Sequence, residues 1–100
     1  MGASSTPEGR VKAGIKKVLD AWGIWYFMPV SNGMGKVGVP DFICCARGLF
    51  LGIEAKAPGK RSHTTPNQQR VMSEIKDHTG HVLVVDHPDQ LTLFLEGLFP

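Results

Sequence analysis

Two carboxylates and one ammonium group lie near the two ends of the most apolar stretch of this sequence, GVPDFICCARGLFLGIEAK. Asp41 stands near the beginning of the stretch, and Glu54 and Lys56 stand near its end. Residues two apart on a strand share a face, so Glu54 and Lys56 are expected to project together. Two carboxylates brought close together stay ionised only with a cation between them. Oxygen ligands of this kind suit Mg²⁺ or Mn²⁺, so the sequence predicts a metal site.

Hydrolysis of a phosphodiester needs a Lewis acid, an activated water and stabilisation of negative charge. A divalent ion held by Asp41 and Glu54, with the main-chain carbonyl of Ala55 as a further ligand, would supply the Lewis acid. Lys56 could orient or deprotonate the attacking water, or hold a phosphate oxygen. The simpler alternative is a surface salt bridge between Glu54 and Lys56 with Asp41 as a turn residue. The metal site is favoured because Asp41 follows a proline, lies at a hairpin distance from Glu54, and is separated from it by strongly apolar strands.

A hairpin must bring these groups together. The runs PDFICC and LFLGIEAK are typical of strands, and Ala46-Arg47-Gly48 predicts a tight turn between them. Antiparallel folding about this turn would place Asp41 roughly level with the segment 54–56. The apolar character of residues 39–56 further predicts strands that are buried on both faces.

Helix and strand signals frame the hairpin on both sides. Proline at the first helical position follows a threonine N-cap twice, and glycines follow the expected helix ends. Apolar runs at 24–30 and 81–86 predict an aromatic-rich strand and a fully buried strand. The resulting order, α-β-β-β-α-β-α, predicts an α/β fold in one domain spanning residues 1–100. The expected helix starts and stops are Thr6 and Gly23, Thr65 and Gly80, and Asp86 or His87 for the last helix.

Composition narrows the class of protein. The 100 residues contain no run of about 18 apolar residues, so no membrane span is expected. The N-terminus lacks the order of a secretory signal, which favours a cytoplasmic protein. Adjacent Cys44 and Cys45 are interpreted as small core residues in a reducing compartment. Residues 1–70 carry ten Lys and Arg against four Asp and Glu, a charge excess that could face phosphates.

The motifs together resemble a nuclease family. Pro40-Asp41 followed by Glu54-Ala55-Lys56 matches the PD-(D/E)xK signature of restriction-endonuclease-like nucleases. Within that superfamily, NGMGKVGVPD and KAPGKRSHTTPNQQ are similar to the virus-type replication-repair nuclease (VRR-NUC) family, in its stand-alone phage and bacterial form. The resemblance covers about residues 7–96. It implies a restriction-endonuclease-like core, with a mixed central sheet flanked by helices, and DNA cleavage that depends on Mg²⁺ or Mn²⁺.

The resemblance also implies the composition of the site. Glu8 would be a further metal ligand, although a first-turn glutamate also complements the helix dipole. Gln68 would join the catalytic group by holding Lys56 or the scissile phosphate, although its spacing from Thr65 also fits a capping box. Gln69 could take the same role. The implied site comprises Glu8, Asp41, Glu54, Lys56 and Gln68, together with the Ala55 carbonyl.

Basic and polar residues in the flanking loops are candidate DNA contacts, with solubility as their simpler role. The resemblance implies a homodimer acting on branched DNA such as a four-way (Holliday) junction, in the bacterial host cytoplasm if the chain is phage-encoded. The alternative is a non-catalytic module that keeps the fold and binds structured nucleic acid. The candidate contacts are Lys36, Lys60, Arg61, Arg70, Asn32 and Thr65.

Overall fold

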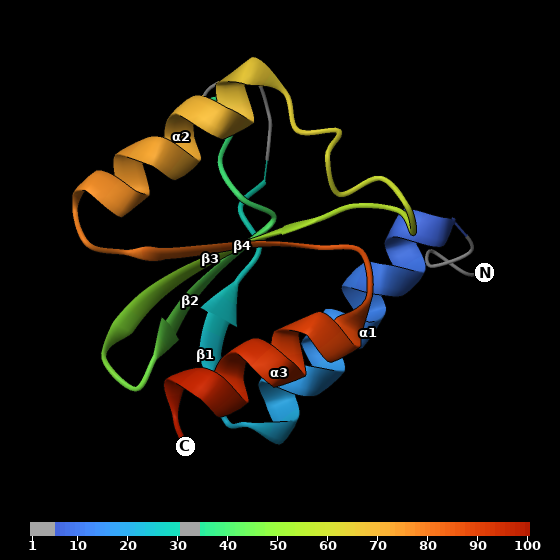
Figure 1. Ribbon diagram of the computed structural model, residues 1–100, viewed down its shortest axis with the longest axis vertical. Helices are drawn as coiled ribbons and strands as arrows, with labels where there is room; N and C mark the ends of the chain where they lie inside the picture. Colours follow the sequence, from blue (N-terminus) through green and yellow to red (C-terminus); the bar gives the residue numbers. More distant parts are fainter. Residues whose placement is uncertain (1–5, 31–34) are drawn as a thin grey trace.

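The computed structural model describes residues 6–30 and 35–100, so the predicted DNA contact Asn32 lies outside the described residues. The elements follow the predicted α-β-β-β-α-β-α order and form a mixed sheet with helices on both faces (Figure 1). They are α1 (Pro7–Ala21), β1 (Trp25–Phe27), β2 (Phe42–Ala46), β3 (Leu49–Ala55), α2 (Pro66–Asp77), β4 (His81–Val85) and α3 (Pro88–Leu98).

The sheet has the strand order β1-β2-β3-β4, with antiparallel pairing except between β3 and β4, which are parallel. The turn between β2 and β3 consists of Arg47 and Gly48, whose positive φ angles of 51° and 88° fit a tight hairpin. This turn fixes the register, in which Phe42 pairs with Ile53. One residue beyond that pair, Asp41 and Glu54 therefore approach each other at the same edge of the sheet.

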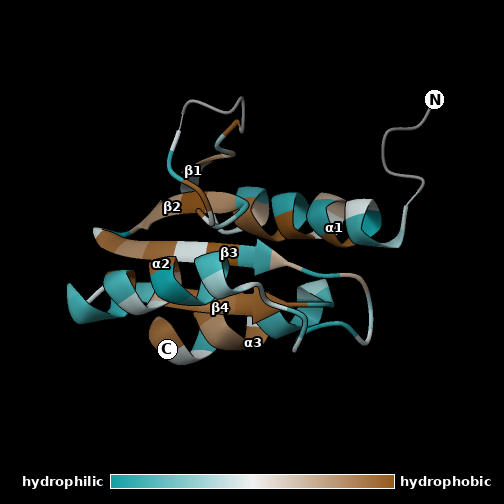
Figure 2. Ribbon diagram, turned by 90° about the horizontal axis from the view of Figure 1, so that it is seen from above, coloured by the Kyte–Doolittle hydropathy of each residue, from teal (hydrophilic) through white to brown (hydrophobic). Residues whose placement is uncertain are grey.

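One face of the sheet is covered by α1 and α3, and the main core lies there. Val11, Ile15 and Leu19 recur every four residues on α1 and are buried, as are Leu91 and Leu95 on α3. Burial of each such side chain stabilises the fold by about 1.5–3 kcal/mol. The strands form a mostly hydrophobic layer between helices that carry hydrophilic residues (Figure 2). This core holds the first turn of α1 near the sheet edge that carries Asp41.

The opposite face is only partly covered, because α2 packs on it chiefly against β4. The expectation of strands buried on both faces is therefore wrong for part of the hairpin: Phe50 is 43% exposed. Cys44 is buried but Cys45 is exposed, so only Cys44 is a core residue, and both thiols are free. Trp25 also points outward, with 63% of its surface exposed.

Two strands differ from their predicted form. The aromatic strand covers Trp25–Phe27 rather than residues 24–30, and Pro29 cannot donate a hydrogen bond to continue it. β4 is an edge strand in which only Val85 is fully buried, so the run 81–86 is not a fully buried strand.

The last helix begins at one of its two predicted caps. Of Asp86 and His87, His87 is the N-cap. No helix in residues 6–30 or 35–100 is both long and apolar enough to cross a membrane.

Candidate active site

Asp41 is tied to the end of β3 by a backbone hydrogen bond. The Ala55 N–H donates to Asp41 Oδ2 at 2.9 Å. The next N–H, that of Lys56, donates to the Val85 carbonyl of β4 at 2.8 Å. Because a trans peptide directs its C=O opposite to its N–H, the Ala55 carbonyl points away from β4, to the side on which Asp41 lies. The sheet edge thus presents a carboxylate and a carbonyl on the same side.

Gln68 connects Glu54 of β3 with Lys56, the residue that follows this strand. Its carboxamide nitrogen donates to Glu54 Oε2 at 2.8 Å, and its carboxamide oxygen accepts from Lys56 Nζ at 3.0 Å. The same oxygen accepts from the Thr65 N–H at 3.0 Å, and Thr65 Oγ1 accepts from the Gln68 N–H at 3.1 Å. The capping box and the contact with the site therefore coexist. Gln69 turns away and donates to Thr64 instead.

Glu54 is the one buried charged residue among those described, with 4% of its surface exposed. The pKa of its carboxyl is raised from 4.5 to about 7, chiefly by burial and also by the nearby Asp41 and Glu8 carboxylates, whereas Lys56 opposes the shift. The Lys56 Nζ lies 3.7 Å from Glu54 Oε2. One ammonium thus only partly offsets the cost of a buried charge beside other acids.

Lys12 is a member of this cluster that the sequence analysis missed. Its Nζ lies 3.4 Å from Glu8 Oε2 and 3.7 Å from Asp41 Oδ1. Glu8 stands four residues before Lys12 on α1, a spacing that favours an ion pair and could have indicated the link. The further link to Asp41 depends on how α1 packs against the sheet, which the spacing does not reveal.

The donor set suits a hard divalent cation. Asp41, Glu54 and Glu8 contribute carboxylate oxygens, and Ala55 contributes a carbonyl oxygen, the ligand types that Mg²⁺ and Mn²⁺ prefer. The pKa of Glu54 is raised chiefly by burial and next by the nearby Asp41 carboxylate, and a bound cation would oppose both effects. Within residues 6–30 and 35–100, however, no three acidic, His or Cys side chains converge closely enough to enclose an ion. The ligand types therefore suit such an ion, although the Glu8 carboxylate is paired with the Lys12 ammonium.

Most of the predicted DNA contacts that the structure describes already have partners within the chain. Lys36 Nζ lies 3.3 Å from Glu74 Oε1, and Arg70 pairs with Asn67 at 2.8 Å and more distantly with Glu74. Arg61 Nε donates to the carbonyl of Val84 in the edge strand β4. Each of these side chains is therefore held in place, and Lys36 and Arg70 keep more than half of their surface exposed.

The two remaining candidates differ in availability. Lys60 is exposed in the loop between β3 and α2. The Asp86 carboxylate holds this loop by accepting from the Gly59 N–H at 2.8 Å, a bond that lowers the pKa of Asp86. Thr65 uses its hydroxyl to cap α2. Lys60 is thus carried by an anchored loop, whereas Thr65 has a structural role of its own.

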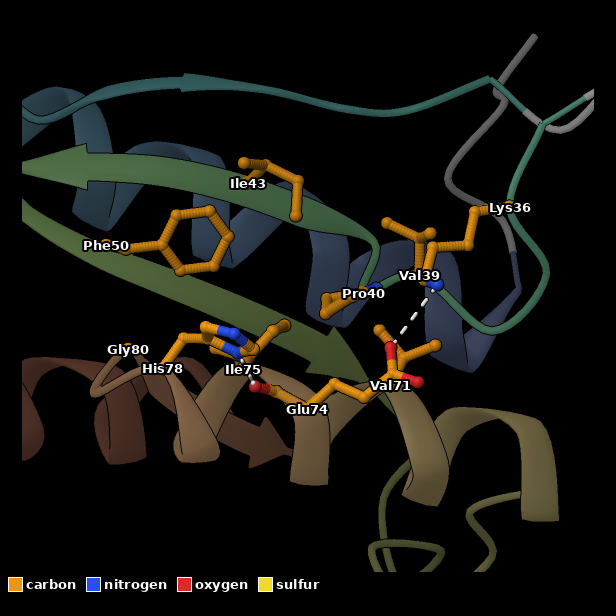
Figure 3. A pocket seen from close by; sticks show the side chains of 10 residues that line it. All are labelled: Lys36, Val39, Pro40, Ile43, Phe50, Val71, Glu74, Ile75, His78 and Gly80. Carbon is orange, nitrogen blue, oxygen red and sulfur yellow. Dashed lines mark hydrogen bonds and ion pairs between the residues drawn. The ribbon is translucent and has the colours of Figure 1, made fainter.

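Pro40, the residue before Asp41, lines two cavities. One of about 290 Å³ is lined by Asp41, Pro29, Val30 and residues 35–40, and so opens beside the candidate site. Another, of about 480 Å³, lies between the hairpin and α2 and is lined mostly by apolar side chains, with the Lys36–Glu74 ion pair across it (Figure 3). The acids of the cluster do not line this larger cavity, so the smaller one is the better entrance to them.

A mixed sheet with an aspartate, a glutamate and a lysine at one edge defines a PD-(D/E)xK nuclease-like fold. Comparison with solved structures gives a "VRR_NUC domain", with a TM-score of 0.72 and 27% identity, covering 92% of this chain and 97% of that one. No protein-family model matches the sequence, and the comparison with curated proteins gives no significant match. This structural likeness extends over nearly the whole of both chains, and it supports the resemblance to the VRR-NUC family and a nuclease-family domain.

Proposed function

We propose that this chain is a divalent-metal-dependent DNA endonuclease that hydrolyses phosphodiester bonds in branched DNA, acting as a homodimer in the manner of a Holliday-junction resolvase. The observation that carries the proposal is the continuous set of contacts linking Asp41, Glu54, Lys56 and Gln68 at one edge of the sheet. These side chains come from the start of β2, the end of β3 and the first turn of α2, with Asp41 and Lys56 one residue outside their strands. A purely structural domain has no evident need for a buried glutamate beside other acids.

The metal would be held by Asp41, Glu54, Glu8 and the Ala55 carbonyl, and when bound it would act as a Lewis acid and activate water. Lys56 lies beside these ligands with its ammonium held by Gln68 at 3.0 Å. From there it can position the attacking water or neutralise charge that develops on a phosphate oxygen. Gln68 keeps both Glu54 and Lys56 in place, which limits the reorganisation needed during reaction.

DNA would approach over the loops that flank the site. Lys36 and Arg70 stand on the α2 side, and Lys60 stands in the anchored loop after β3. Their contacts to phosphates would position the backbone without reading sequence, so binding should weaken as salt rises. A branch preference would require two sites at a fixed spacing, which is why the proposal includes a homodimer.

The test is cleavage of a panel of DNAs, comprising a four-way junction, a flap, a nicked duplex and an intact duplex, with Mg²⁺, Mn²⁺ or Ca²⁺. We expect the junction to be cut with Mg²⁺ or Mn²⁺, and Asp41→Ala, Glu54→Ala and Lys56→Ala each to lose cleavage by at least about 100-fold. Light scattering on the same samples reports the mass of the particle. Lys16→Ala, an exposed lysine on α1, is the control.

Two outcomes would separate the enzyme from a binding module. Junction binding without metal-stimulated cleavage would favour the non-catalytic module. Cleavage by the three variants at the wild-type rate would show that the activity arises elsewhere or from a contaminant.

A further inference from the structure

A single ammonium group joins two acids that come from different parts of the fold. Lys12 reaches Glu8 on its own helix and Asp41 at the sheet edge, at 3.4 Å and 3.7 Å. Its side chain is 31% exposed, and that of Asp41 is 23% exposed, so the pair is partly shielded from water. Such an ion pair is stronger than one on an open surface, although it is still reachable by ions from solution.

Two other oxygens of the cluster accept hydrogen bonds from neutral donors. Asp41 Oδ2 accepts from the Ala55 N–H, and Glu54 Oε2 accepts from Gln68. Lys56 serves as the cation beside Glu54, and Lys12 serves as the cation between Glu8 and Asp41. In the absence of a metal, two lysines therefore compensate three acids, which lets the cluster remain assembled.

We propose that Lys12 is a built-in counter-ion of the site, which holds Glu8 and Asp41 in the metal-free protein and is displaced when a divalent cation binds. This inference rests on the proposed function. Mg²⁺ binds oxygens at about 2.0–2.1 Å and accepts little deviation from octahedral geometry. Asp41 Oδ1 and Glu8 Oε2 cannot serve such an ion fully while they also face the ammonium, so the two cations compete.

The lysine side chain is suited to displacement. It carries a compact charge on a flexible four-carbon stem, and its partial exposure offers a route into solvent. Lys12 is thus a positioning residue, and it accounts for the incomplete convergence of the acids: Glu8 is oriented toward an ammonium on its own helix.

The test compares Lys12→Met with Lys17→Met, which removes the same charge from an exposed position on α1. Circular dichroism measures the melting temperature of each metal-free protein, and electron paramagnetic resonance measures the Mn²⁺ left free in a titration. We expect Lys12→Met to melt about 2–5 °C lower than Lys17→Met without metal. We also expect it to bind Mn²⁺ about 5- to 10-fold more tightly, because the competing cation is gone. Lys12→Arg should restore the wild-type pattern.

A lower melting temperature combined with tighter Mn²⁺ binding is specific to a counter-ion, since loss of a merely structural residue would weaken both. Mn²⁺ binding by Lys12→Met that is equal to or weaker than that of Lys17→Met would overturn the role of Lys12 and leave the metal site standing. If neither the wild type nor Lys12→Met takes up Mn²⁺, the proposed function and this inference both fail.

Discussion

The carboxamide of Gln68 donates to Glu54 Oε2 at 2.8 Å while its oxygen caps the start of its own helix. One side chain therefore completes a helix cap and orients a buried acid. Loss of the side chain should affect both functions, and the cap alone can be removed at Thr65.

Gln68→Ala should destabilise the protein and reduce cleavage, whereas Thr65→Ala should mainly destabilise it. Removal of a cap costs about 1 kcal/mol, and each variant loses it. Only Gln68→Ala also frees Glu54 and Lys56, so we expect its rate to fall at least about 10-fold below that of Thr65→Ala. Urea unfolding and junction cleavage measure the two effects. Equal rates for the two variants would show that Gln68 is a cap and nothing more.

Gly38→Ala should disturb the site through the backbone of α2. Gly38 has a φ of 86°, and an added Cβ would lie 2.5 Å from the Asn67 carbonyl oxygen and 2.9 Å from the Gln68 nitrogen. Gly48 has nearly the same φ, 88°, with no atom within 4 Å of its Cβ position. Gly48→Ala should thus cost about 1–2 kcal/mol from φ alone.

Comparison of Gly38→Ala with Gly48→Ala separates the cost of a positive φ from the cost of the steric clash with α2. Gly38→Ala should lose at least about 1 kcal/mol more than Gly48→Ala in the free energy of unfolding, and should also lose cleavage. Similar stabilities of the two variants would mean that the loop before β2 can withdraw from α2 at little cost.

The stability of the metal-free protein should fall as the pH rises. Unfolded Glu54 gives up its proton near 4.5, but the folded protein retains it until its pKa of about 7. Between these values the folded state binds more protons than the unfolded state, so the free energy of unfolding decreases with pH, by at most about 1.4 kcal/mol per unit. Glu54→Gln should remove this contribution. Urea unfolding of both proteins from pH 4 to 8, with a chelator present, measures the difference, and parallel curves would contradict it.

The two adjacent thiols should react very differently. Burial raises the pKa of Cys44 to about 12, whereas Cys45 lies on the exposed side of β2. The native protein should therefore titrate one thiol rapidly with an aromatic disulfide reagent and the second only after unfolding. Cys45→Ser should abolish the rapid phase and leave the fold unchanged. Two rapid equivalents in the native wild type would show that β2 opens readily.

The sequence predicts the parts of this fold that depend on local signals. Threonine-proline pairs mark the starts of α1 and α2, and the turn at Arg47-Gly48 sets the hairpin register that places Asp41 opposite Glu54. Local signals also favour Gln68 over its neighbour, because a capping box directs the third helical residue back toward the N-cap.

What the sequence does not reveal depends on contacts between distant elements. The apolar residues of a strand look alike whether or not a helix covers them, so the exposure of Cys45 and Phe50 could not be read from their types. The link from Lys12 to Asp41 depends on the docking of α1 against the sheet. Charge, spacing and periodicity do not encode that docking.

Metal binding by Asp41 and Glu54 is tested most directly by calorimetric titration of Mn²⁺ into the wild-type protein, Asp41→Asn and Glu54→Gln. Both substitutions keep side-chain volume and a hydrogen-bond acceptor, so the fold should persist and only the charge should be lost. We expect saturable Mn²⁺ binding by the wild type that weakens at least about 10-fold in each variant. Mn²⁺ binding that is absent from the wild type, or that is unchanged in both variants, would contradict it.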